Sequence, residues 1–280
     1  MGPNSLMEYS GNGMILYVTM ALIVLGGLGF VVWFDLIDGI KKSLRQKIGF
    51  SGMVARFSEH TKLVLSITAA LILLGTLGIF ILEYDNPATI GNMPLGEKLL
   101  NSLFQSITFR TAGFAAIPQD ALREVSCVLG NVLMFIGGSP VGTAGGIKTV
   151  TAVLFLMNGL SYIRGQKETV IFHRSVSGEM MRKAAAVVMV SLITAILLLI
   201  LLMSTGDISL NDGMYEVISA ISTVGLSRNL TASLNVAGRI VIIIAMFLGR
   251  IGPISMAFFF TSEKKRKNTI RHAEGLFYVG

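Results

Sequence analysis

Two short segments of the chain share a Thr-x-Gly pattern that is followed by a large apolar residue. They are Thr111-Ala112-Gly113-Phe114 and Thr223-Val224-Gly225-Leu226, and they lie 112 residues apart. Glycine permits a positive φ and places no side chain in the way, so the carbonyl groups of such a segment can line a narrow path. Because a ring of carbonyl oxygens can replace the hydration shell of a monovalent cation, the pattern predicts a cation filter.

The surroundings of the two Thr-x-Gly segments are also repeated. Each ends a short semi-polar stretch with helical character, at 97–114 and 211–227, that is too short to cross a bilayer. Each precedes an apolar stretch with a break, "FIGGSP" at 135–140 and "FLGRIGP" at 247–253. Internal repeats are common in transport proteins, and irregular backbone at membrane depth must line a cavity or be buried in protein. An ordinary external loop would explain one copy, but two copies in the same context favour re-entrant pore loops.

The first of these breaks extends over "GGSPVGTAGGIKT", 137–149. Its characteristic residues are Gly137, Gly138, Ser139, Pro140, Gly142, Thr143, Gly145, Gly146 and Lys148. Five glycines and a proline cannot sustain a regular helix. The lysine spacing does not fit a Walker A loop, and no strand precedes the segment. Since one proline suffices for a simple kink, we expect a mobile intramembrane loop below the filter.

Two arginines lie in apolar surroundings. Arg110 directly precedes the first filter threonine, and Arg250 lies inside the last apolar stretch. A charge at membrane depth costs roughly 3 kcal/mol or more, so each guanidinium requires a partner or water. We expect Arg110 to point away from the ion path and to pair with an acid or with carbonyl groups. Arg250 is expected to face a water-filled cavity, with a buried structural pair as the alternative.

The composition places these features in a membrane. Of the 280 residues, 52% are hydrophobic and 14% are charged, and the mean hydropathy is +0.71. A soluble domain has about 25% charged residues. Five apolar segments are long enough to cross a bilayer, at 14–34, 63–82, 121–160 (interrupted), 184–205 and 236–260. The sequence therefore predicts an all-α polytopic membrane protein with span–pore helix–span repeats.

The basic residues follow the connections between these spans. The segments 36–62, 161–183 and the C-terminal tail hold 16 of the 23 lysines and arginines. The positive-inside rule places these three segments in the cytoplasm, and 83–120 and 206–235 outside. The net charge of +7 is then explained by topology, and no nucleic-acid site is expected. This orientation leaves the N-terminus outside, yet residues 1–13 contain no signal peptide, so upstream spans are expected.

Residues typical of enzymes are not arranged for catalysis. His60, His173 and His272 share no metal-ligand spacing, and nothing forms a Ser/His/Asp or paired-carboxylate site. The single cysteine, Cys127, lies in an apolar run, where a buried inert thiol is expected. We therefore predict no enzyme activity and no covalently bound cofactor.

The motifs "FQSITFRTAGF", "GGSPVGTAGGIKT", "STVGLS" and "GRIGP" closely resemble the Trk/Ktr/HKT superfamily of potassium transporters, in particular the membrane subunit of bacterial Ktr systems. The resemblance covers nearly the whole chain. It implies four span–pore helix–span repeats around one central pore, with one filter glycine from each repeat. It also implies that loop 137–149 is a gating loop and that Arg250 lies beneath the filter, where it could oppose cation passage.

The resemblance divides the chain into five parts. Residues 1–62 match the last span of the second repeat and a cytoplasmic linker, 63–162 the third repeat, 163–183 a second linker, 184–262 the fourth repeat and 263–280 a cytoplasmic tail. An N-terminal half with two further filter segments is therefore expected as a missing partner. The other implied partners are membrane lipid, a second copy in a homodimer and a cytosolic RCK-type nucleotide-binding regulator. Potassium is the implied transported ion, with sodium as a candidate activator.

Three functions remain open on the sequence. The first is a potassium-conducting transport subunit, or the C-terminal part of one. The second is a sodium-permeable or sodium-coupled carrier with the same architecture, because two filter segments are unseen. The third is a non-conducting remnant that assembles with a full-length subunit. An upstream reading frame with two more Thr/Asn-x-Gly turns would distinguish a transporter part from a remnant.

Overall fold

The computed structural model describes residues 5–47, 49–166, 168–172 and 174–252. The helices are η1 (Met7–Tyr9), α1 (Gly13–Gly27), α2 (Phe30–Gln46), α3 (Phe50–Ala55), α4 (Glu59–Glu83), α5 (Leu95–Thr108), α6 (Glu124–Phe135), α7 (Thr149–Ile163), α8 (Gly178–Met203), α9 (Leu210–Ile221), α10 (Leu230–Ser233) and α11 (Val236–Ile251). The strands β1 (Val170–Ile171) and β2 (Arg174–Ser175) form one small antiparallel hairpin between α7 and α8. The predicted all-α class is confirmed. The tail 263–280 and the end of the predicted span 236–260 lie outside the described residues.

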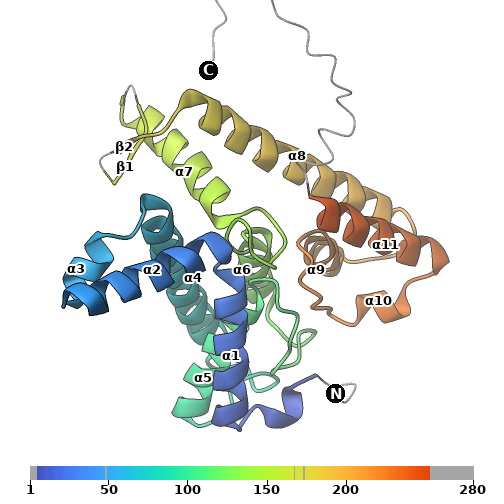
Figure 1. The fold of residues 1–280 in the computed structure, drawn as a ribbon. Coiled ribbons are helices and arrows are strands. Elements are labelled where there is room, and N and C mark those ends of the chain that lie inside the picture. Colours follow the sequence, from blue (N-terminus) through green and yellow to red (C-terminus); the bar gives the residue numbers. More distant parts are fainter. Residues whose placement is uncertain (1–4, 48, 167, 173, 253–280) are drawn as a thin grey trace, which may run out of the picture.

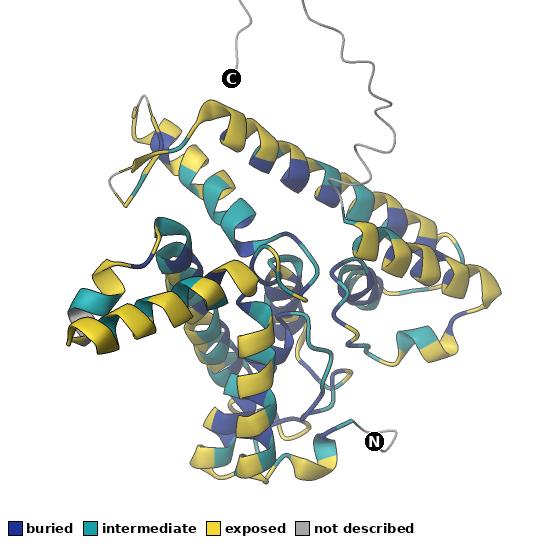
Figure 2. Ribbon diagram, in the orientation of Figure 1, coloured by how far each residue is buried: buried dark blue, intermediate teal, exposed yellow. Residues whose placement is uncertain are grey.

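Helices α4 and α8 are long and apolar enough to cross a membrane. α4 contains the predicted span 63–82, and α8 contains the predicted span 184–205 except for its last two residues. Each begins at a serine whose hydroxyl accepts a hydrogen bond from a backbone N–H in the first turn, Ser58 from Thr61 and Ser177 from Met180. Much of the surface of α8 is exposed (Figure 2), and its exposed side chains include Leu192, Ile193 and Ile196. Such an apolar outer face suits contact with lipid.

The apolar segment 14–34 is not one helix. α1 ends at Gly27 and α2 begins at Phe30, with an angle of 99° between them. Gly29, at the bend, has φ +84° and ψ 150°, a conformation that residues with a side chain rarely adopt. α2 then continues as an amphipathic helix that is mostly exposed (Figure 2). The predicted span 14–34 is therefore divided between two helices, because the glycines break the helix before the apolar run ends, and the pair passes the length and hydropathy test for a span only when taken together.

A glycine with the same backbone conformation as Gly29 also follows α11. Gly252, directly after the last helical residue, has φ 83° and ψ 150°. The two breaks have related sequences, "GGLG" at 26–29 and "GRIG" at 249–252. Between them in the sequence, α6 ends at Phe135 and residues 136–148 form no helix before α7 begins. Three helices therefore end in glycine-rich breaks.

The packing of the helices follows the internal repeat. α4 packs against the short helix α5, and α8 packs against the short helix α9. α6 packs against α9 just as α1 packs against α5, as Figure 1 allows the reader to follow. α1 therefore takes the same position relative to the first unit, α4 and α5, as α6 takes relative to the second unit, α8 and α9. A core shared by both units contains Phe109, Cys127, Tyr215 and Val224, so the two units form one packed body.

Candidate ion filter and intramembrane loop

The two Thr-x-Gly segments adopt the same backbone pattern. Their first and third residues both have positive φ, with Thr111 at +69°, Gly113 at +78°, Thr223 at +52° and Gly225 at +92°. A positive φ is unusual for a β-branched residue and costs of order 1–3 kcal/mol. Such strain persists only where the surroundings impose it, and it is concentrated at functional sites. Residues 111–114 and 223–226 are called the filter turns below.

A hydroxyl group on each short helix holds the filter turn that follows it. Thr108 Oγ1 donates a hydrogen bond of 2.6 Å to the carbonyl of Phe114, and Ser219 Oγ donates one of 2.6 Å to the carbonyl of Leu226. The backbone N–H groups of Ala112 and Val224 also bond back to the helix ends. Hydrogen bonds to the preceding helix therefore hold each filter turn on both sides of its glycine. These bonds keep the strained Thr111 and Thr223 in place.

The two filter turns lie in direct contact. A Cβ atom added to Gly113 would lie 2.3 Å from the carbonyl oxygen of Val224. At Gly225 the nearest atom to such a Cβ is Cα of Gly113, at 3.8 Å. The predicted filter residues of both repeats are thus brought together. Their large apolar members pack into protein, Leu226 in the shared core and Phe114 against the cluster that contains α1.

One end of loop 137–149 is held in the bend between α1 and α2. The N–H of Ser139 donates to the carbonyl of Gly27 at 3.0 Å, and the N–H of Phe30 donates to the carbonyl of Val141 at 3.2 Å. Thr143 Oγ1 adds a bond of 3.2 Å to the carbonyl of Gly26. The bend between α1 and α2, which the sequence did not predict, therefore holds this end of the loop by hydrogen bonds.

The other end of the loop lies against the end of α9. A Cβ at Gly145 would lie 2.1 Å from Thr223 Oγ1 and 2.3 Å from the carbonyl oxygen of Ser222. On α11, a Cβ at Gly249 would lie 2.0 Å from the carbonyl oxygen of Ile221. Glycines in the loop and in α11 thus allow both segments to approach the base of the second filter turn closely.

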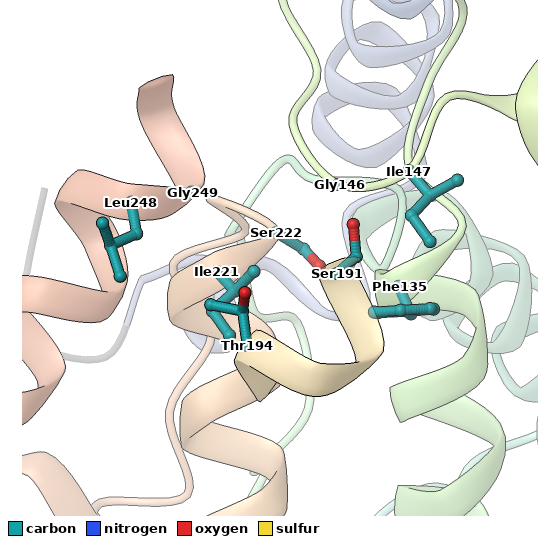
Figure 3. A pocket seen from close by; sticks show the side chains of 9 residues that line it. All are labelled: Phe135, Gly146, Ile147, Ser191, Thr194, Ile221, Ser222, Leu248 and Gly249. Carbon is teal, nitrogen blue, oxygen red and sulfur yellow. The ribbon is translucent and has the colours of Figure 1, made fainter. Parts of the chain in front are cut away.

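A small cavity of about 30 Å³ remains where these segments meet (Figure 3). It is lined by Phe135, Gly146, Ile147, Ser191, Thr194, Ile221, Ser222, Leu248 and Gly249. The Ser222 hydroxyl is buried and has no hydrogen-bond partner among the described residues. A cavity of this size, whose lining includes the hydroxyl-bearing residues Ser191, Thr194 and Ser222, can hold a water molecule.

A larger cavity of about 530 Å³ lies beside the loop and next to the second filter turn. Its lining includes loop residues from Gly142 to Lys148, together with Thr223 and Arg250. The side chains of Lys148 and Arg250 border this cavity, and no Asp or Glu among the described residues lines it. Lys148 Nζ donates to the carbonyl of Ala144, so its charge is held by the loop itself. The predicted position of Arg250 next to a cavity agrees with this arrangement.

The surroundings of Arg110 differ from the expectation of a paired guanidinium. Its side chain is 9% exposed, and its Nε has no hydrogen-bond partner among the described residues. The ion pairs found in the described part of the chain, Arg174–Glu59 and Arg228–Asp212, do not include it. Arg110 instead lines a cavity of about 390 Å³ between α1 and the first filter turn. The prediction of an acidic or carbonyl partner is therefore not met within these residues.

Several residues of the site were not singled out from the sequence. Thr108 and Ser219 precede their filter turns by three and four residues, so the 112-residue offset does not align them, and their shared role is visible only in the structure. Ser222 carried no signal in the sequence, and the bend at Gly29 is marked only by the related glycine sequences at 26–29 and 249–252. Cys127 is buried and free, as predicted, and it contacts the Arg228 guanidinium. No group of three or more metal-ligating His, Cys, Asp or Glu side chains occurs in the described residues.

Comparison with known proteins places the chain in a family. The family described as "TrkH: Cation transport protein" matches residues 1–270. The Ktr system potassium uptake protein B of Bacillus subtilis is 40% identical over 278 residues, covering 99% of this chain and 59% of that protein. The protein of the same name from Vibrio alginolyticus is 34% identical, covering 91% of this chain and 54% of that protein. The potassium/sodium uptake protein NtpJ of Enterococcus hirae is 32% identical, with the same coverage of 91% and 54%.

A solved structure shares the fold. The crystal structure of the potassium transporter TrkH from Vibrio parahaemolyticus matches with a TM-score of 0.75 at 16% identity, covering 93% of this chain and 55% of that chain. The chain spans slightly more than half the length of the curated relatives and of the solved structure that it matches. It is a multi-pass integral membrane protein that belongs to the TrkH family of cation transport proteins.

Proposed function

We propose that this chain forms part of a potassium-conducting pathway in a membrane transport subunit. The observation that carries the proposal is the pair of filter turns with the same strained backbone, in contact at Gly113 and Val224. Carbonyl groups held in this way coordinate a cation without reorganisation, because each turn is fixed at both ends. The names of the two Ktr relatives, which are potassium uptake proteins, support potassium as the ion.

The proposed pathway continues past loop 137–149 and Arg250. The loop is held by α1 on one side and by the end of α9 on the other, and the 530 Å³ cavity next to it has two cationic side chains. A cation that leaves the filter turns would meet this positive field, which opposes passage. Displacement of the loop would carry Lys148 with it and widen the path. The loop and Arg250 together are therefore proposed as the gate.

Sodium transport is the second candidate. One relative is named a potassium/sodium uptake protein, at 32% identity. Since the chain spans about half of that protein, the residues that distinguish the two ions could lie in the other half. Sodium as an activator belongs to the same proposal, and no covalent cofactor or enzyme activity is proposed.

The proposed partners follow from the same reasoning. A segment with two further filter turns would complete the coordination of the ion, and lipid would cover the exposed apolar faces of α4 and α8. A homodimer and a cytosolic RCK-type nucleotide-binding regulator are proposed from the family resemblance. Complete uptake activity is proposed for the assembled subunit, and a non-conducting remnant is the alternative.

A growth experiment tests the proposed function. On the proposal that the missing repeats precede this chain, the part of the Bacillus subtilis relative that this chain does not match is joined upstream of residues 1–280, and the joined protein is expressed in cells that lack potassium uptake. Growth at low potassium is expected for the joined protein and not for residues 1–280 alone, because a cation needs oxygen ligands on all sides. The Gly113→Ser form of the joined protein is the control for filter function. Membrane-inserted joined protein without growth rescue would support the remnant.

A further inference from the structure

A buried polar network connects the two repeats behind the filter turns. Gln105 on α5 and Gln119, in the segment after the first filter turn, form a reciprocal amide pair, with Nε2–Oε1 distances of 2.6 and 3.1 Å. The hydroxyl of Tyr215 on α9 donates to Gln119 Oε1 at 2.9 Å. Gln119 Nε2 also donates to the carbonyl of Ile117 at 2.7 Å. Gln119 therefore bonds to both repeats.

The network is shielded from solvent, and the amide groups of both glutamines are hydrogen-bonded. Gln105 and Tyr215 are fully buried, and Gln119 is 3% exposed. Neither Gln105 nor Gln119 has a buried side-chain atom without a partner. In a buried site a missing partner is unfavourable, so the three side chains favour one relative position of α5 and α9.

Each end of the network lies one helical turn before a group that holds a filter turn. Gln105 precedes Thr108 by three residues, and Thr108 bonds to the carbonyl of Phe114. Tyr215 precedes Ser219 by four residues, and Ser219 bonds to the carbonyl of Leu226. Residues three or four apart on a helix share one face. The network thus lies on the helix faces that carry the two hydroxyl groups holding the filter turns.

We propose that Gln119 is a positioning residue of the filter, which through Gln105 and Tyr215 fixes the separation of the two filter turns and so determines the discrimination between potassium and sodium. The inference rests on the proposed function for its ion selectivity, whereas the fixed separation is a property of the fold. Selectivity by carbonyl groups depends on how many oxygens surround the ion and how far they can move. Loosening the network should therefore affect both turns at once.

Amide hydrogen exchange of residues 1–280 in lipid nanodiscs tests the structural part. Gln105→Met lies on α5, and Tyr215→Phe removes only a hydroxyl from α9. Each substitution is expected to speed exchange in both filter turns by about fivefold, the factor that corresponds to about 1 kcal/mol for one neutral hydrogen bond. Exchange in α8 should stay unchanged. Tyr9→Phe is the matched control, because Tyr9 is exposed and its hydroxyl has no hydrogen-bond partner among the described residues.

The exchange rate in the filter turn farther from the substitution decides between the outcomes. A local packing role would speed exchange only in the turn nearest to the substitution, and that outcome, or no change in either turn, would overturn the proposal. The double variant Gln105→Met/Tyr215→Phe should add little to either single variant, since both break one network. Additive effects would show two independent contacts and would also refute it.

Ion selectivity tests the functional part in the joined protein described above. Tyr215→Phe is expected to lower the preference for potassium over sodium in uptake by about fivefold, while Tyr9→Phe retains it. If the unmodified joined protein transports no potassium, the proposed function fails, and the exchange data still decide whether the network fixes the turns. If it transports selectively and Tyr215→Phe is equally selective, the positioning role of Gln119 is refuted.

Discussion

Gly113 and Gly225 occupy matching filter turns but have different surroundings. A side chain at Gly113 would clash with the carbonyl of Val224, whereas a Cβ at Gly225 would make only an ordinary contact, 3.8 Å from Cα of Gly113. Gly113→Ser should therefore combine a steric clash with an unfavourable φ, and Gly225→Ser should have only the unfavourable φ. We expect potassium selectivity over sodium to fall by about tenfold in Gly113→Ser, equivalent to about 1.4 kcal/mol, and by less in Gly225→Ser. Competition of sodium with potassium uptake in the joined protein measures both, and unchanged selectivity in both variants would remove the filter assignment.

At the scale of single residues, the sequence was most informative where chemistry leaves few choices. The positive φ of Gly113 and Gly225 could be predicted because few other residues allow it, and the repetition made that prediction specific; their role in an ion filter stays a prediction. The surroundings of Arg110 could not be predicted, because a guanidinium can donate to many kinds of partner, and whether one lies within reach is set by distant parts of the fold. The Gln105–Gln119–Tyr215 network also escaped detection, since only the packing of the two units, in which α6 contacts α9, brings Gln119 to Tyr215.

At the scale of elements, a larger side chain at Gly145 would displace loop 137–149. Gly145→Ala places a Cβ within 2.3 Å of Ser222 and Thr223 atoms, so the loop must move away from the end of α9. If the loop obstructs the path, the rate of rubidium uptake should rise by about tenfold, since overpacking costs about 1–3 kcal/mol in the closed arrangement.

Gly159→Ala on α7 is the matched control for this substitution. No atom lies within 4 Å of a Cβ at this position, and alanine favours a helix more than glycine does. Uptake should therefore stay at the unmodified rate. Equal rates in Gly145→Ala and in the unmodified protein, at equal amounts in the membrane, would show that the loop does not gate the pathway.

The helices themselves were predicted with uneven success. Helices α4 and α8 could be located because each combines a serine cap with a long apolar run. The bend at Gly29 was missed because the apolar run continues through it to Phe34, so hydropathy gave no sign of a break. The related glycine sequences at 26–29 and 249–252 contained the signal, but its meaning depends on the loop that occupies the bend.

At the scale of the whole molecule, the two filter turns are bordered by further space. Besides the cavity beside Arg110, a cavity of about 340 Å³ borders Thr223, Gly225 and Glu216 on the other unit. The chain spans just over half of the relatives that it matches, and under the proposed function further segments of a complete subunit would fill these spaces. The central claim is that the filter turns provide part of the ligand set of one potassium ion.

Anomalous diffraction from crystals of the joined protein grown with thallium(I), a heavy substitute for potassium, tests this claim most directly. The anomalous signal reports the ion itself, independently of transport rates, gating and expression. We predict a peak beside the backbone carbonyl groups of residues 111–113 and 223–225, which weakens when potassium replaces thallium in the crystal. Well-ordered filter turns with thallium bound only at other positions would contradict the claim.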